Sequence, residues 1–96
     1  MHAAALRLEL RIPGVRSLKA KRSVVRAVSS MLTGTYPVAV SEVGHQDQWQ
    51  RATLGVALVA PQAGHLERLI HSVQRTMLDH ADVELLKMGV AYLEER

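Results

Sequence analysis

The sequence predicts an α+β protein in which a four-stranded antiparallel sheet carries two helices on one face. Residues 5–12 alternate between apolar and charged side chains, which is the period-two pattern of a half-buried strand. Residues 66–77 repeat apolar side chains at helical spacing, which indicates an amphipathic helix. The segments follow the order β-α-β-β-α-β, and right-handed crossovers leave a ferredoxin-like βαββαβ sandwich as the leading topology. The 96 residues are expected to form one domain, 1–96.

Turn and cap signals delimit the first two elements. The strand over residues 5–12 ends at Pro13-Gly14, a dipeptide that is typical of turns. Ser17 can accept a hydrogen bond from a free backbone N–H, so it predicts the start of a helix. This helix is expected to run to about Leu32, with Gly34 as a left-handed residue just past its end.

The remaining elements are joined by short connections. Residues 37–43 alternate and are rich in β-branched side chains, which predicts the second strand. The polar residues 44–48 predict a hairpin loop, and residues 49–60 predict a long third strand. After the helix over 66–77, residues 82–93 predict the fourth strand.

The last strand has two competing phases. Val83 and Leu85 fall on one face of the predicted strand. The opposite face carries Leu86, Met88, Val90 and Tyr92. A bulge at Gly89 would let the chain switch faces, and the sequence leaves open which series faces solvent.

Composition excludes several classes of function. The chain has no cysteine, so disulfides, thiolate catalysis and thiolate metal sites are excluded. The histidines show no zinc-site spacing, and phosphate-loop, dinucleotide and serine-hydrolase motifs are absent. We therefore expect no cofactor, no metal and no enzymatic activity. No apolar run approaches the roughly 18–20 residues that span a bilayer, and no signal peptide is recognisable, which predicts a cytoplasmic protein without membrane contact.

Positive charge is concentrated near the start of the chain. Seven of the 12 Lys and Arg residues lie within residues 1–26, against one acidic residue. Lys19, Arg22 and Arg26 share one face of the first predicted helix, and Arg16 extends this basic row. Long basic side chains on one face can contact a phosphate backbone without reading bases. The row therefore favours a role near RNA or the ribosome, and the alternative is a set of solvated or paired surface charges.

Two further charged residues, Lys21 and Glu42, fall at positions that face the core. In the expected topology the first helix starts where the second strand ends, which places both near His45 and Asp47. A charge at an inward position must be paired or must reach water. We expect a structural ion pair between Lys21 and Glu42. An acid–base or ligand-gripping site is one alternative, and two unrelated side chains that reach solvent are the other.

The uncovered face of the sheet predicts self-association. Trp49, Ala57 and Val59 face outward on the third strand, and one of the two series of the fourth strand joins them. An apolar face of this kind is usually covered, most simply by a second copy across a two-fold axis. A homodimeric structural or small-ligand-binding domain is therefore the alternative to an RNA-associated role. Phenylalanine is absent, which disfavours RNA binding by base stacking on the sheet.

Two segments, residues 17–25 (SLKAKRSVV) and 42–56 (EVGHQDQWQRATLGV), resemble the YlxP-like family of small bacterial proteins, a domain family of unknown function. The resemblance spans nearly the whole chain and implies a ferredoxin-like fold. It implies no activity and no functional residue. Genes of this family often lie among those for translation initiation and ribosome maturation factors, which adds to the expectation of an RNA or ribosomal partner. Pro37 and Ser41 stand where the family more often has other small or polar residues.

Overall fold

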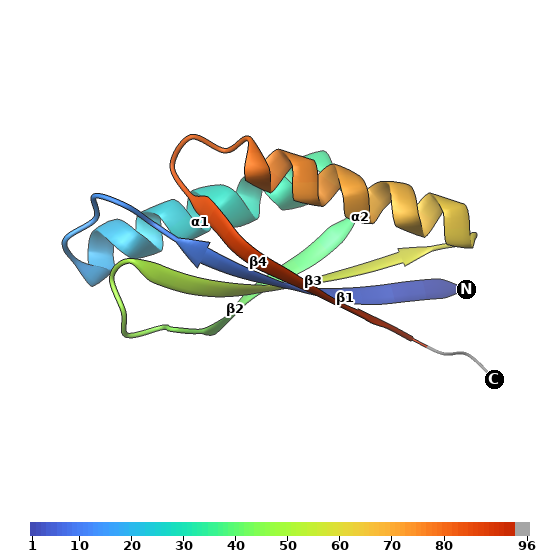
Figure 1. The fold of residues 1–96 in the computed structure, drawn as a ribbon, viewed down its shortest axis with the longest axis horizontal. Helices are drawn as coiled ribbons and strands as arrows, with labels where there is room; N and C mark the ends of the chain where they lie inside the picture. Colours follow the sequence, from blue (N-terminus) through green and yellow to red (C-terminus); the bar gives the residue numbers. More distant parts are fainter. Residues whose placement is uncertain (94–96) are drawn as a thin grey trace.

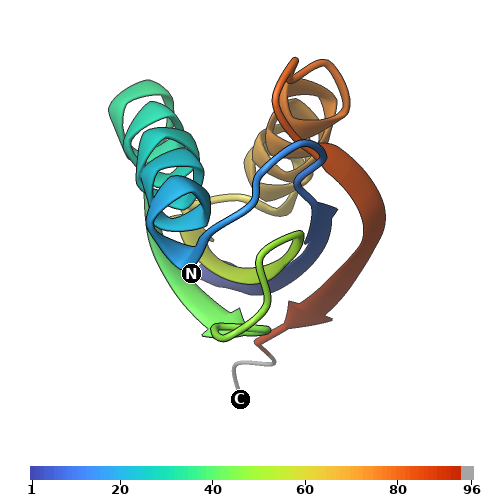
Figure 2. The same ribbon diagram turned by 90° about the vertical axis from the view of Figure 1, so that its left-hand side faces the viewer.

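The computed structural model describes residues 1–93 and contains four strands and two helices. Their bounds are β1 His2–Arg11, α1 Leu18–Thr35, β2 Val38–Gly44, β3 Arg51–Ala60, α2 Ala63–Leu78 and β4 Glu84–Tyr92. The strands form one sheet in the order β2-β3-β1-β4, and each neighbouring pair is antiparallel. Both helices lie on the same side of the sheet (Figure 1), and an end-on view shows them next to each other over it (Figure 2). The predicted ferredoxin-like α+β sandwich is confirmed.

An apolar core fills the space between the sheet and the two helices. On β1 the side chains alternate between buried and exposed or half-buried, so that Leu6, Leu8 and Leu10 face the helices. The buried apolar residues of α1, β3 and α2 are Val25, Val28 and Leu32 on α1, Ala52, Leu54, Val56, Leu58 and Ala60 on β3, and Leu66, Ile70, Val73 and Met77 on α2. The helical and strand periodicities of the sequence therefore place the core as expected. The opposite side of the sheet, called here the open face, carries no helix (Figure 2).

Helix α1 continues beyond the predicted end at Leu32 and stops without a left-handed residue. Gly34 lies inside the helix and has no positive φ, so its predicted role as a cap is wrong. The helix stops because Pro37 forces the preceding residue, Tyr36, into an extended conformation with φ −127° and ψ 152°. The Tyr36 hydroxyl donates a hydrogen bond of 3.2 Å to the Ser72 carbonyl oxygen, which ties the end of α1 to α2.

The phase of β4 is set by a bulge at Leu86. Glu9 pairs with Lys87 and Leu10 pairs with Leu85, so Leu86 is the extra residue between them. The residues of β4 that share the helix side of the sheet are Leu85, Met88, Val90 and Tyr92. Because of this bulge before Lys87, Leu85 lies on the same side of the sheet as Met88 and Val90, although a regular strand would place them on opposite sides.

The bulge expected at Gly89 is wrong, because Gly89 pairs regularly with Arg7. The sequence predicted that either Leu85 or the series of Met88, Val90 and Tyr92 faces outward. Both alternatives are wrong, because all four side chains lie on the helix side. The open face of β4 carries Glu84, Lys87, Gly89 and Ala91. This face is therefore made of smaller and more polar side chains than the apolar series that suggested self-association.

Candidate functional site

The loops before α1 and between β2 and β3 lie at the same end of the molecule, on the left in Figure 1, which is called here the loop end. The start of α1 is set by Ser17, whose hydroxyl accepts a hydrogen bond of 3.0 Å from the Ala20 backbone N–H. Lys21 follows in the first turn. At the same end, β2 delivers Glu42 and the following loop delivers His45. The topology therefore gathers the charged residues that the sequence placed there.

Lys21 is fully buried at the loop end, and its ammonium has two partners. Nζ lies 2.8 Å from Glu42 Oε2 and donates a hydrogen bond to the backbone carbonyl oxygen of His45. The contact with Glu42 is an ion pair outside hydrogen-bond geometry, and no group among residues 1–93 donates a hydrogen bond to that oxygen. The Glu42 side chain remains 20% exposed. The ion pair thus joins the first turn of α1 to the end of β2, with one carboxylate at the edge of solvent.

A bulge at the end of β2 allows this arrangement. Glu42 pairs with Leu54 and Gly44 pairs with Thr53, so Val43 is the extra residue. Glycine at position 44 fits this close approach, because a Cβ there would lie 3.1 Å from Thr53 Oγ1 and would push that side chain aside by a few tenths of an ångström. Glu42 therefore keeps its inward position, while the chain beyond the bulge turns toward Lys21.

The burial of Lys21 limits what the pair can do chemically. A side chain with no exposed surface cannot touch a substrate without a rearrangement of α1. Its ammonium is held by one charged and one neutral acceptor, which is how a buried cation is stabilised. The geometry is that of a structural tie between helix and sheet.

A second cluster lies on the open face at the loop end, and the sequence analysis did not find it. It is called here the Glu9 cluster. Thr53 Oγ1 donates to Glu9 Oε2 at 2.7 Å, and Arg7 Nε donates to Glu9 Oε1 at 2.9 Å. His45 Nε2 lies 3.8 Å from the same Oε2. Strand alternation places Arg7, Glu9 and Thr53 outward, but only the register brings Thr53 opposite Glu9.

The hydrogen bonds and charges of this cluster displace the pKa of the Glu9 carboxyl. The hydrogen bond from Thr53 is the largest cause, and it lowers the pKa of Glu9 below the ordinary value of 4.5. Partial burial opposes this shift, while the hydrogen bond and charge of Arg7 and the charge of His45 reinforce it. The cluster therefore favours the ionised carboxylate.

Replacing Thr53 with valine is expected to make the free energy of unfolding depend less on pH in the acid range. The pKa of Glu9 is lower in the folded than in the unfolded protein, so its ionisation stabilises the fold above the unfolded pKa. This contribution is lost as the pH falls through the folded pKa. Without the Thr53 donor, the loss of stability between about pH 7 and about pH 3 should shrink, as measured by urea unfolding.

The matched control is Thr53→Ser, which keeps a hydroxyl donor at the same place. An NMR titration of the Glu9 carboxyl should give a higher pKa in the valine variant than in the serine variant. Identical titrations of Glu9 in both variants would show that the Thr53 hydroxyl does not cause the shift.

The basic row of Arg16, Lys19, Arg22 and Arg26 is fully displayed to solvent. All four side chains are exposed, and none of them forms an ion pair with a residue in the range 1–93. Asp47 in the hairpin loop, which could have neutralised the row, is likewise exposed and takes no part in an ion pair with these side chains. The row thus contrasts with Arg7, Arg11 and Lys21, each of which has a carboxylate within 4 Å.

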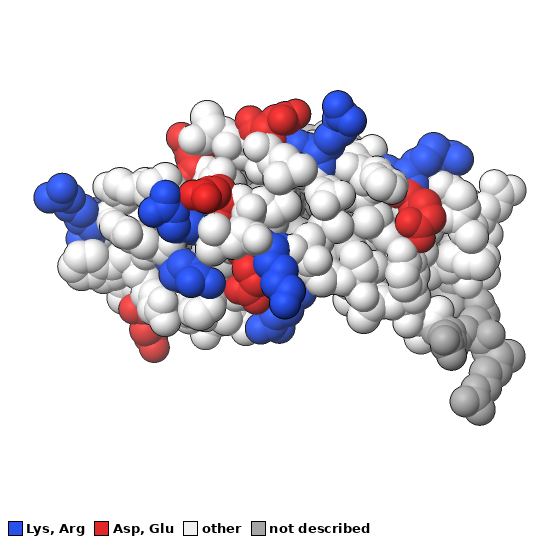
Figure 3. Space-filling view, in the orientation of Figure 1, with Lys and Arg blue, Asp and Glu red and all other residues white. Residues whose placement is uncertain are grey.

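Charges elsewhere on the surface are mixed. On the face drawn in Figure 3, Lys and Arg side chains alternate with Asp and Glu side chains over the whole width of the molecule. No group of three or more His, Asp or Glu side chains in the described part of the chain could hold a metal ion. Within residues 1–93, no helix is both long and apolar enough to cross a bilayer.

The fold defines the chain as a small ferredoxin-like α+β protein, and comparison with known proteins shows its family. A family model described as a protein of unknown function (DUF503) matches residues 3–90, so the chain belongs to this family. It is 35% identical over 57 residues to the uncharacterized protein YlxP of Bacillus subtilis (strain 168). The match covers 59% of this chain and 62% of that relative, less than two thirds of the relative's length. The resemblance to the YlxP-like family is confirmed.

Proposed function

We propose that this protein is a non-enzymatic binding protein that docks on the phosphate backbone of structured RNA, including ribosomal RNA, through the basic row of α1. The observation that carries the proposal is the set of four exposed cations that lack a carboxylate partner within residues 1–93. Arg7, Arg11 and Lys21 are paired with carboxylates, whereas the basic row gathers four cations, unpaired within the described chain, at the start and along the first half of one helix. This clustering makes it the surface that best fits an external anion.

The position of the row in α1 adds to its attraction for phosphate. Residues 15–35 contain no Asp or Glu, so nothing within the helix neutralises the row. Lys19 and Arg26 are about 10 Å apart along the axis at the rise of an α-helix. The row occupies the N-terminal half of α1, where the helix dipole also favours an anion.

Readout of bases is not expected from this surface. Tyr36 and Tyr92 both use their hydroxyls in hydrogen bonds within the protein, to Ser72 and Glu67. Trp49 is exposed by 51%, in the loop between β2 and β3. The open face of the sheet carries no aromatic ring in its central rows, which removes the stacking platform that sheet-type RNA binders use. Binding should therefore depend on RNA shape and phosphate density more than on sequence.

The test compares two charge reversals of equal size. Arg22→Glu with Arg26→Glu alters the basic row, and Arg68→Glu with Arg75→Glu alters exposed cations of α2. The first variant should bind structured ribosomal RNA fragments at least about tenfold more weakly than wild type, while the second should stay within about threefold. Fluorescence anisotropy at low salt measures the affinity, and thermal unfolding verifies that both variants are folded.

The salt dependence provides a second readout. Contact with two to four phosphates predicts that wild-type affinity falls by roughly one to two orders of magnitude between about 50 and 200 mM salt. An equal loss of affinity in both variants would mean that net charge, and not the basic row, attracts the RNA. Absence of binding at low salt would overturn the proposal.

A further inference from the structure

The open face contains a row of four alanines that crosses all four strands. Ala39 on β2 pairs with Ala57 on β3, Ala57 pairs with Ala5 on β1, and Ala5 pairs with Ala91 on β4. The next outward row toward the loop end is Ser41, Gly55, Arg7 and Gly89. Two adjacent rows thus contain, with one exception, the smallest side chains that a sheet can carry.

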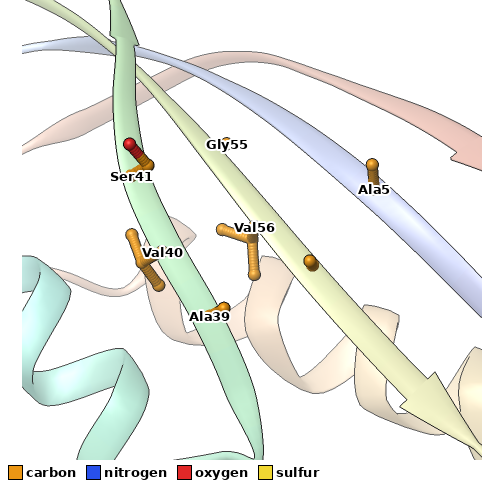
Figure 4. Close-up of a pocket in the computed structure, with 7 residues that line it drawn as sticks. Ala5, Ala39, Val40, Ser41, Gly55 and Val56 are labelled. Atoms are coloured by element: carbon orange, nitrogen blue, oxygen red, sulfur yellow. The ribbon is translucent and has the colours of Figure 1, made fainter.

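These two rows form a continuous shallow groove. One hollow of about 280 Å³ lies over Ala5, Ala39, Ser41, Gly55 and Ala57 (Figure 4), and one of about 460 Å³ extends from Ala5 and Gly55 toward Gly89 and Ala91. Both hollows share Ala5 and Gly55, so they join across the sheet. In Figure 4, Ala5 and Ser41 lie on either side of Gly55 and point away from the helices.

Two valines flank the groove, and Arg7 lines its larger hollow. Val43 is exposed by 50% and Val59 by 58%, on opposite sides of the alanine row. Val43 leans over Gly55, where an added Cβ would lie 3.2 Å from Val43 Cγ1. In a two-fold dimer the same surface of both copies must be self-complementary. Here the valines of one copy can pack into the groove of small residues of the other copy.

We propose that the open face is the interface of a homodimer in which two copies pack sheet against sheet. Four strands about 4.8 Å apart and about nine residues long present roughly 600 Å² per copy. Two such faces would remove roughly 1,200 Å² from water, which reaches the lower end of the range for specific interfaces. The small side chains in the groove let the two sheets approach closely without a clash.

Two arginines of the open face, Arg7 and Arg11, are paired with carboxylates. Arg7 pairs with Glu9 at 2.9 Å, and Arg11 pairs with Glu84 at 2.9 Å. These pairs lower the positive charge of the face and with it the repulsion between identical faces, although Lys87 on β4 has no carboxylate partner within residues 1–93. The basic row of α1 lies on the helix side and stays exposed in such a dimer, so the dimer and the RNA proposal can fail independently.

The cysteine-free sequence permits a direct test by thiol labelling of single-cysteine variants. Ala57→Cys places a small thiol in the groove, and Ala81→Cys places one in the exposed connection between α2 and β4 as the control. Labelling at position 57 should be at least about fivefold slower at about 200 µM protein than at about 1 µM. The higher concentration shifts the equilibrium toward the dimer, in which the partner covers this thiol. Labelling at position 81 should be the same at both concentrations.

Sedimentation equilibrium then tests whether the groove causes the association. Wild type should sediment as a dimer at tens of micromolar, while Ala57→Arg and Ala39→Arg should each raise the dimer dissociation constant at least about tenfold. Ala81→Arg should leave it unchanged. A wild type that stays monomeric, or a dimer that survives both groove substitutions in folded protein, would overturn the proposal.

Discussion

Replacing Glu42 with alanine is expected to lower the free energy of unfolding by about 2–3 kcal/mol. The Lys21 ammonium would then remain fully buried with the His45 carbonyl oxygen as its acceptor. Loss of one partner of a buried ion pair usually costs more than this. Here, the 20% exposure of Glu42 lets water reach the vacated position and offsets part of the loss. Urea unfolding at neutral pH measures the change.

Two further variants separate the charge from the packing of this pair. Glu42→Gln keeps an oxygen acceptor and should lose less stability than Glu42→Ala. The double variant Lys21→Met with Glu42→Met removes both charges while filling similar volume, so it should recover much of the loss. A Glu42→Ala protein that is as stable as wild type would mean that Lys21 does not need its carboxylate.

Replacing Leu8 with alanine is expected to cost about 3–5 kcal/mol, which threatens folding of a domain of this size. Leu8 has no exposed surface and lies on the central strand β1, directly between Leu54 of β3 and Met88 of β4. Both neighbours are held by the sheet, so the cavity left by the deleted side chain cannot close easily. Chemical or thermal unfolding of the variant provides the measurement.

The neighbouring residue Arg7 supplies a matched control on the same strand. It points to the open face, and its ion pair with Glu9 is 64% exposed on the arginine side. Arg7→Ala should change the free energy of unfolding by less than about 1 kcal/mol. Similar losses in the Leu8 and Arg7 variants would contradict the placement of the core on one side of β1.

The sequence predicted the central elements well because each has a strong local period. Leu6, Leu8 and Leu10 alternate with charged residues on β1, and α2 repeats apolar residues in helical spacing. The fourth strand was not predictable in phase, because its bulge at Leu86 depends on pairing with Glu9 and Leu10 of β1. A bulge is a property of two strands together, and one strand's sequence does not contain it.

The same distinction applies to the loop end. The proximity of Lys21 and Glu42 could be anticipated, since two inward charges at one end of a known topology have few other partners. The Glu9 cluster could not, because it depends on the register of β1 with β3 and on the path of the chain after the bulge at Val43. The left-handed backbone of His45, with φ 59°, is part of that path and carries no signal in the sequence.

Both outer strands of the sheet are interrupted, β2 at Val43 and β4 at Leu86. An incoming strand would find a regular ladder on β2 only along Val38–Glu42, and a bulged edge also twists away from a straight partner. Addition of strands at the edges is how sheet proteins grow into fibres. The bulges at both edges of the sheet therefore disfavour open-ended polymerisation by strand addition. They do so even though β2 carries no lysine or arginine to repel a neighbouring strand.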